Sequence, residues 1–141
     1  MEYVKEGKTY VVKVARGERL VKSVKKLVND EKIEGGFFVG LGACDEVELA
    51  HYSVEDKKYT SKKFRQALEI ANLTGNVAWA EGELVVHAHG TFGDEEMRTV
   101  AGHVVDLKIS ATLELWFTET ERLVKRKDEE TGLNLLALKR V

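Results

Sequence analysis

Three of the four histidines lie close together in the sequence and carry the side chain that transition metals favour. They are His87, His89 and His103. Neutral imidazole is a good ligand for zinc and, less selectively, for iron, copper and nickel. A His-x-His pair in a strand is also common as a packing or surface feature, so the third histidine is what turns the pair into a candidate metal site.

The segment around these histidines is typical of a β-hairpin. Residues 84–92 and 99–105 are rich in β-forming side chains, and the glycine and acidic residues at 93–96 have a turn composition. Alternate residues of a strand project from one face, which places His87 and His89 together. A turn centred near residue 95 would put His103 directly across from His87 and diagonal to His89, within cross-strand reach.

The rest of the chain predicts one helix among many strands. Leu20, Val21, Val24, Leu27 and Val28 form an apolar stripe at helical spacing over residues 20–31. Residues 64–73 fit either a helix or a strand. Other segments are typical of strands, and 120–130 is charged enough to be a surface segment; the expected strands are 9–16, 36–43, 46–52, 76–83, 110–118 and 133–138. Together they predict one α/β domain over residues 1–141, mostly antiparallel sheet.

Composition limits the classes of function. The 141 residues include 22 basic and 24 acidic ones, a net charge of −2 that disfavours a strongly cationic nucleic-acid binder. The first residues lack the apolar stretch of a signal peptide, no apolar run is long enough for a membrane span, and a single cysteine, Cys44, fits a reducing compartment, so we expect a cytoplasmic protein. An excess of lysine and glutamate is typical of thermophiles, although the absence of proline points the other way.

Several segments resemble the PPC domain, the plants and prokaryotes conserved domain, long known as a domain of unknown function. The likeness in order and spacing extends over nearly the whole chain, and its clearest motifs lie between residues 64 and 117. One departure is the loss of an aromatic residue that plant members carry just before the Glu-Ile pair at 69–70. The matching segments are LEIANLTGNV at 68–77, VHAHG at 86–90, VAGHVV at 100–105 and ATLE at 111–114.

The resemblance implies more than the residues themselves show. It implies a seven-stranded antiparallel sheet with flanking helices, of α+β type, assembled as a homotrimer, and it assigns residues 64–73 to a strand. In prokaryotic members the three histidines bind a metal, usually zinc, which carries over to His87, His89 and His103. Plant members bind AT-rich DNA through a separate AT-hook, and this chain has neither proline nor an Arg-Gly-Arg run.

The sequence is compatible with three functions. The first is a trimeric, metal-binding PPC protein with a regulatory or DNA-associated role. The second is a zinc enzyme of unknown substrate, in which three histidines leave a fourth metal position open and Glu114 or Glu69 acts as a base or as an acceptor for an imidazole N–H. In the third, the metal only staples the fold. His51, on another strand among ordinary neighbours, has no assigned role.

The basic residues form three clusters that we interpret as solvated faces, because acidic residues balance them. A trimer would multiply the negative net charge, and neither a recognition helix nor an AT-hook is present. We therefore expect DNA to bind weakly and without sequence preference, if at all. The clusters are at 57–58, 62–65 and 122–127.

Overall fold

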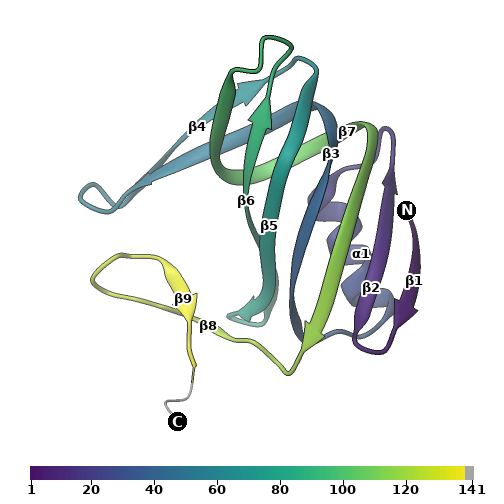
Figure 1. Ribbon diagram of the computed structural model, residues 1–141. Helices are drawn as coiled ribbons and strands as arrows, with labels where there is room; N and C mark the ends of the chain where they lie inside the picture. Colours follow the sequence, from purple (N-terminus) through teal and green to yellow (C-terminus); the bar gives the residue numbers. More distant parts are fainter. Residues whose placement is uncertain (139–141) are drawn as a thin grey trace.

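A seven-stranded antiparallel sheet forms most of the molecule, with a helix against one face (Figure 1). The computed structural model describes residues 1–138, and these contain one helix, α1 (Leu20–Asp30). The strands are β1 (Glu2–Glu6), β2 (Thr9–Ala15), β3 (Gly35–Ser53), β4 (Lys58–Phe64), β5 (Leu68–Ala80), β6 (Glu83–Gly93), β7 (Thr99–Thr120), β8 (Lys125–Lys127) and β9 (Asn134–Leu136). The seven-stranded antiparallel sheet that the resemblance implied is thus confirmed.

Two long strands, β3 and β7, organise the sheet. Its order is β1-β2-β7-β6-β5-β3-β4, and an additional pairing of β3 with β7 makes β3, β5, β6 and β7 a closed ring of neighbours. β3 changes partners along its length, with register shifts on both sides of Gly42. A Cβ at Gly42 would lie 2.1 Å from the carbonyl oxygen of Thr112, so only glycine allows β3 to approach β7 so closely there.

The helix covers the core through the apolar stripe predicted from the sequence. Leu20, Val24, Leu27 and Val28 are all buried, and α1 ends at Asp30, one residue before the predicted end. Burying such a stripe against a sheet supplies most of the stability of a short helix. The largest buried side chains beneath it come from several strands and include Tyr10, Phe38, Phe92, Leu113 and Phe117.

The ambiguous segment 64–73 is resolved in favour of a strand. β4 ends at Phe64, three residues make the connection, and β5 begins at Leu68. Leu68, Ile70 and Leu73 are buried. The first two alternate with exposed Glu69 and Ala71, which is the period of a half-buried strand and not of a helix.

The C-terminal part of the described chain forms a small hairpin of its own. β8 pairs with β9 as a separate two-stranded sheet, which lies at one side of the main sheet in Figure 1. Two contacts tie its turn to the main sheet: the Tyr52 hydroxyl donates to the Thr131 carbonyl oxygen at 2.7 Å, and the Lys57 ammonium donates to that of Glu129 at 2.8 Å. The prediction that 120–130 is simply a surface segment is wrong at Lys125, which is buried.

Residues 1–138 contain no helix with the length and hydropathy needed to cross a membrane.

Candidate metal centre

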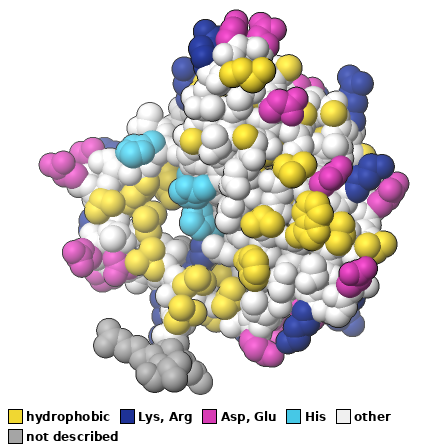
Figure 2. All heavy atoms as spheres, in the orientation of Figure 1, with side chains coloured by type: hydrophobic (Ala, Val, Ile, Leu, Met, Phe, Trp, Pro, Cys, Tyr) yellow, Lys and Arg dark blue, Asp and Glu magenta, His cyan; other side chains and the backbone are white. Residues whose placement is uncertain are grey.

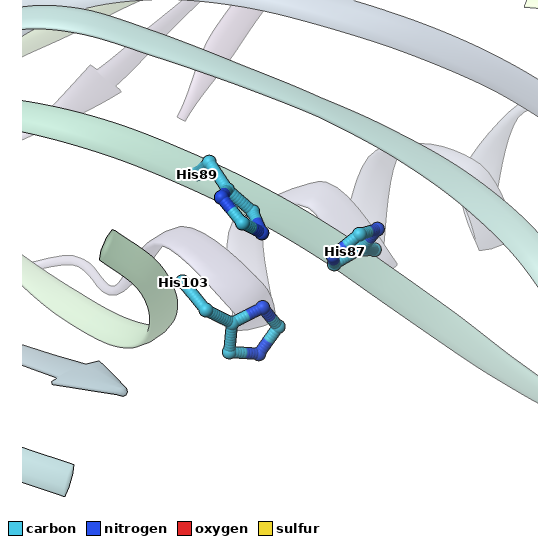
Figure 3. A group of neighbouring side chains, drawn as sticks. All are labelled: His87, His89 and His103. Atoms are coloured by element: carbon cyan, nitrogen blue, oxygen red, sulfur yellow. The ribbon is translucent and has the colours of Figure 1, made fainter. Parts of the chain in front are cut away.

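Three imidazole rings converge where β6 meets β7 (Figure 3). Each histidine offers one ligand nitrogen, and the three nitrogens lie within 4.8 Å of one another. The ring centroids form a nearly equilateral triangle, with separations of 5.1 Å for His87–His89, 5.2 Å for His87–His103 and 5.4 Å for His89–His103. The structure therefore brings together all three histidines that the sequence singled out.

The predicted pairing of the hairpin was wrong by one position on each strand. His103 lies directly across from His89 and diagonal to His87, the reverse of the expected arrangement. The reason is the turn, which has five residues, 94–98, and is therefore centred on residue 96. The Asp94 carboxylate holds this turn together by accepting hydrogen bonds from the backbone N–H groups of Glu96 and Arg98.

The alternation of β6 explains why the histidines face away from the core. Ala88, Gly90 and Phe92 are buried on one face of the strand, and His87 and His89 project from the other. At Gly90 a Cβ would lie 2.8 Å from the Phe92 ring, so glycine leaves room for that ring in the core. The apolar face fixes the strand, and the histidine face is thereby presented to a pocket.

Burial and nearby positive charge keep His87 and His103 neutral. Desolvation is the main reason that the pKa of His87 is lowered to about 4, with Lys125 and the other two imidazoles adding to the effect. Burial likewise lowers the pKa of His103, followed by the influence of His89 and of Lys125. Two of the three imidazoles thus have an unprotonated nitrogen at neutral pH, which is the form that binds a metal.

Two unsatisfied polar atoms at the site fit a bound metal. Nδ1 of His103 is buried and has no hydrogen-bond partner among the described residues. The same is true of Oδ1 of Asn76, which lies in register with His87 across β5 and β6. A metal ion satisfies an imidazole nitrogen directly, and an amide oxygen can accept a hydrogen bond from the other nitrogen of a ligating histidine. The donor set of three imidazoles suits zinc.

A pocket of about 560 Å³ opens beside the centre, and His87 and His103 form part of its wall. In Figure 2 histidine side chains lie beside a hollow with hydrophobic side chains around it. Five further polar residues of the wall were missed by sequence reasoning: Glu48, Tyr59, Ser61, Lys125 and Asn134. The Tyr59 ring lies 5.4 Å from that of His103. Metal ligation with one side open to a pocket leaves room for water or a ligand on the metal.

The acidic residues proposed from the sequence lie elsewhere. Glu69 is exposed on β5, in register with Gly93, and Glu114 is exposed on β7, in register with Lys13 and Leu41. Neither lines the pocket, which has Glu48 as its one carboxylate within residues 1–138. His51 is exposed on β3 opposite Thr60 and is not part of the cluster.

Lys125 illustrates why sequence reasoning missed some residues of the pocket wall. Its neighbours Arg126 and Lys127 are exposed, and the three form a basic run that looks solvated throughout. The residue becomes visible only once the β8–β9 hairpin is placed against the main sheet, since no local signal in the sequence distinguishes it from its neighbours.

Comparison with known proteins finds one matching family model and several solved structures with a similar fold. A model of the Plants and Prokaryotes Conserved (PCC) domain matches residues 1–121. A crystal structure from Bacteroides thetaiotaomicron, of a proposed DNA-binding protein, is 28% identical and superposes with a TM-score of 0.93, covering 99% of this chain and 98% of the other. No curated protein matches the chain.

Two further solved structures are of similar size. A proposed DNA-binding protein from Ralstonia eutropha is 31% identical, with a TM-score of 0.90 and coverage of 97% of this chain and 96% of its own. A protein from Archaeoglobus fulgidus that is described as metal-containing is 25% identical, with a TM-score of 0.86 and coverage of 97% of both chains.

Proposed function

This chain belongs to the Plants and Prokaryotes Conserved domain family, and from that premise we propose that it is a metal-binding protein whose three histidines hold one divalent transition metal. Zinc is the first candidate, because three neutral imidazoles are a common zinc donor set. The convergence of His87, His89 and His103 within 4.8 Å carries the proposal. A relative described as metal-containing supports it.

The pocket favours a metal centre that binds a ligand over a metal that only stabilises the fold. A purely structural zinc is closed by four protein ligands, whereas three histidines leave a position free on the pocket side. Zinc in such a site supplies a Lewis acid and lowers the pKa of a bound water to about 7. The protein's own residues would orient a ligand in the pocket and limit the access of bulk water to it.

The alternative function, a zinc-dependent enzyme, is favoured by one carboxylate in the pocket wall. Glu48 accepts a hydrogen bond from the Ser61 hydroxyl at 2.9 Å and lies 3.3 Å from the Lys63 ammonium. These two contacts lower the pKa of Glu48, so it is ionised at neutral pH. An ionised carboxylate in the same pocket as a metal is positioned to take up a proton during a reaction.

Metal analysis of a variant tests the centre. In His89→Ala one of the three imidazoles is removed from an exposed position, so the fold should be retained. We expect the purified wild type to contain about one metal per chain by elemental mass spectrometry, and the variant to contain almost none. His51→Ala is the matched control and should retain the wild-type content. Unchanged metal in His89→Ala, or none in the wild type, contradicts the proposal.

A homotrimer is the assembly that we propose. An apolar patch on β3 and β7 remains solvent-exposed in the single chain, with Phe37 50%, Leu41 52% and Trp116 43% exposed; hydrophobic side chains are also prominent on the face shown in Figure 2. Patches of this kind mark protein–protein contacts. Light scattering should give about three times the chain mass of 15.9 kDa. Trp116→Glu should lower that mass, whereas Val54→Glu, an exposed change outside the patch, should not.

DNA association follows from the descriptions of two relatives and is proposed here only as weak binding. Exposed basic residues of this chain are partly neutralised, for example Lys63 by Glu48 and Arg65 by Glu46, both at 3.3 Å. At ~150 mM salt we expect dissociation constants of about 10⁻⁴–10⁻⁶ M, the non-specific range, by fluorescence anisotropy. Nanomolar binding that prefers AT-rich over mixed duplexes would contradict this expectation.

A further inference from the structure

The pocket beside the metal centre has a second polar end, formed by Lys125. The side chain of Lys125 is only 7% exposed. Among residues 1–138 it makes neither a hydrogen bond nor an ion pair, so its ammonium has no partner within the protein described. Lys125 lies beyond residues 1–121, the part of the chain that matches the family model. Burial of the residue disfavours the charged form of the side chain, so the pKa of Lys125 is lowered.

A few backbone hydrogen bonds anchor the segment that carries Lys125. Next to it, Val124 accepts a hydrogen bond from the Ala137 N–H at 2.9 Å, and Leu123 accepts one from the Trp79 N–H at 2.9 Å. Lys125 itself pairs with Leu136 in the β8–β9 ladder. Because the backbone on both sides of Lys125 is paired, its side chain is a regular part of the pocket wall.

Positive charge would accumulate in this pocket once the metal is bound. Lys125 is close enough to His87 and His103 to disfavour their protonation. A divalent metal on the same imidazoles would face the same ammonium, and two cations in a partly desolvated pocket repel each other. Glu48 is the one carboxylate of the wall among the described residues, and it is engaged with Ser61 and Lys63. An anion from outside would satisfy both cations.

Most of the remaining wall is aliphatic, with Tyr59, Ser61 and Asn134 as its uncharged polar side chains, and this restricts the kind of anion. A volume of about 560 Å³ is in the range of small-molecule sites. A phosphate group prefers several N–H donors or arginines, and no arginine and no second lysine line the pocket within residues 1–138. A single carboxylate with a hydrocarbon chain matches one ammonium and apolar walls better. The aliphatic side chains of the wall come from Ala50, Val85, Val86, Val105, Leu133 and Leu135.

Building on the metal centre proposed above, we propose that this pocket binds a short aliphatic monocarboxylate, with the carboxylate held between the metal and the Lys125 ammonium. The hydrocarbon chain then lies against the aliphatic wall. The three histidines hold the metal, Lys125 on β8 provides the second cation, and the C-terminal hairpin adds Leu133 and Leu135 to the apolar surface. Ligand binding thus depends on a residue that takes no part in holding the metal.

Calorimetric titration of the zinc-loaded chain with hexanoate tests this inference, after the zinc content has been measured. We expect hexanoate to bind with a dissociation constant of about 1 mM or tighter. Hexanamide has the same shape without the charge and should bind at least tenfold more weakly, as should inorganic phosphate. In cobalt-loaded protein, hexanoate should also change the visible absorption bands, because an oxygen ligand enters the metal coordination.

The variant Lys125→Met, which keeps the length of the side chain and removes its charge, should retain full zinc content. It should weaken hexanoate binding about tenfold to a hundredfold, as expected for the loss of a buried charged hydrogen-bond donor. Lys127→Met, an exposed change on the same strand, should bind hexanoate like the wild type.

Two results would overturn the inference. If the chain holds stoichiometric zinc but does not distinguish hexanoate from hexanamide, the carboxylate pocket is wrong and the metal centre stands. If the chain holds no zinc, both proposals fail. The comparison of hexanoate with hexanamide on the wild type decides the first point even if Lys125→Met does not fold.

Discussion

Two walls of the pocket, one carrying the histidines and one carrying Lys125, are built in different ways. The histidine wall is a single hairpin, β6 and β7, whose opposite face is part of the hydrophobic core. The lysine wall is the β8–β9 hairpin, in which each strand has three residues and β9 is exposed. The histidine wall is fixed by buried side chains, and the lysine wall by a few hydrogen bonds to the main sheet. The metal should therefore sit on the rigid wall and the ligand-pairing charge on the more adaptable one.

The largest loss of stability should come from a substitution in the core behind the histidine wall. Phe92 is fully buried on β6, so Phe92→Ala should lower the free energy of unfolding by about 3–5 kcal/mol, from lost burial and the cavity left behind. Leu135 on β9 is 45% exposed, and Leu135→Ala should change it by less than about 0.5 kcal/mol. Urea denaturation measures both. Equal losses would show that the two walls are equally part of the core.

Removal of the metal should have the next largest effect. A ligand present at about 100 times its dissociation constant stabilises the folded state by about 2.7 kcal/mol, and a chelator should remove that stabilisation. The sheet should nevertheless stay folded, since the three histidines project away from the core. Circular dichroism during thermal unfolding, with and without chelator, checks this. Complete unfolding on chelation would instead support the interpretation that the metal only staples the fold.

Acid should destabilise the metal-free protein through His87. Its pKa is about 4 in the folded chain, against an ordinary value of 6.5, so between pH 6.5 and 4 the unfolded chain binds a proton that the folded chain does not. Stability is complete above this window and falls by roughly 2 kcal/mol as the pH decreases through it, once partial exposure is allowed for.

The variant His87→Asn isolates this contribution from that of the carboxylates. The difference in unfolding free energy between wild type and variant should change with pH between 6.5 and 4 and be constant above. His51→Asn, at an exposed site outside the cluster, should follow the wild-type profile throughout. A pH-independent difference for His87→Asn would mean that burial does not hold this imidazole neutral.

The smallest effects concern the turns of the two hairpins, each of which is held by an aspartate. Asp94 accepts backbone hydrogen bonds in the β6–β7 turn. In the β8–β9 turn Asp128 accepts one hydrogen bond from the backbone N–H of Thr131 and one from its hydroxyl. Asp94→Ala should lower the free energy of global unfolding by about 1 kcal/mol. Asp128→Ala should leave global unfolding unchanged and speed amide hydrogen exchange in β8 and β9 only. The reverse pattern would contradict the ranking of the two walls.

The histidine wall could be predicted from sequence because its signals are local. Alternation along residues 84–92, a turn composition and the His-x-His pair all lie within one hairpin, and the resemblance supplied the seven-stranded sheet around it. The pairing was wrong by one position on each strand because composition does not specify how many residues a turn contains. The five-residue turn depends on the backbone hydrogen bonds to Asp94, which only the structure shows.

The lysine wall could not be predicted, since its position depends on contacts between distant segments. Lys125 is buried because Trp79 and the β3–β4 hairpin hold the C-terminal hairpin against the sheet. Glu69 and Glu114, the carboxylates predicted to act as a base or as an acceptor for an imidazole N–H, are exposed and do not line the pocket. Glu48 belongs to a strand that meets the site only through the pairing of β3 with β7, at Ala50 opposite His103.

The central claim, a metal held by three histidines, is tested most directly by anomalous scattering from a crystal of the zinc-loaded protein. Data collected on both sides of the zinc absorption edge locate the ion independently of any assumed ligand. The account predicts one strong peak per chain, bonded to nitrogens of His87, His89 and His103 at about 2.0–2.1 Å and with a further position facing the pocket. A zinc-loaded crystal with no peak there, or with its peak among other residues, would contradict it.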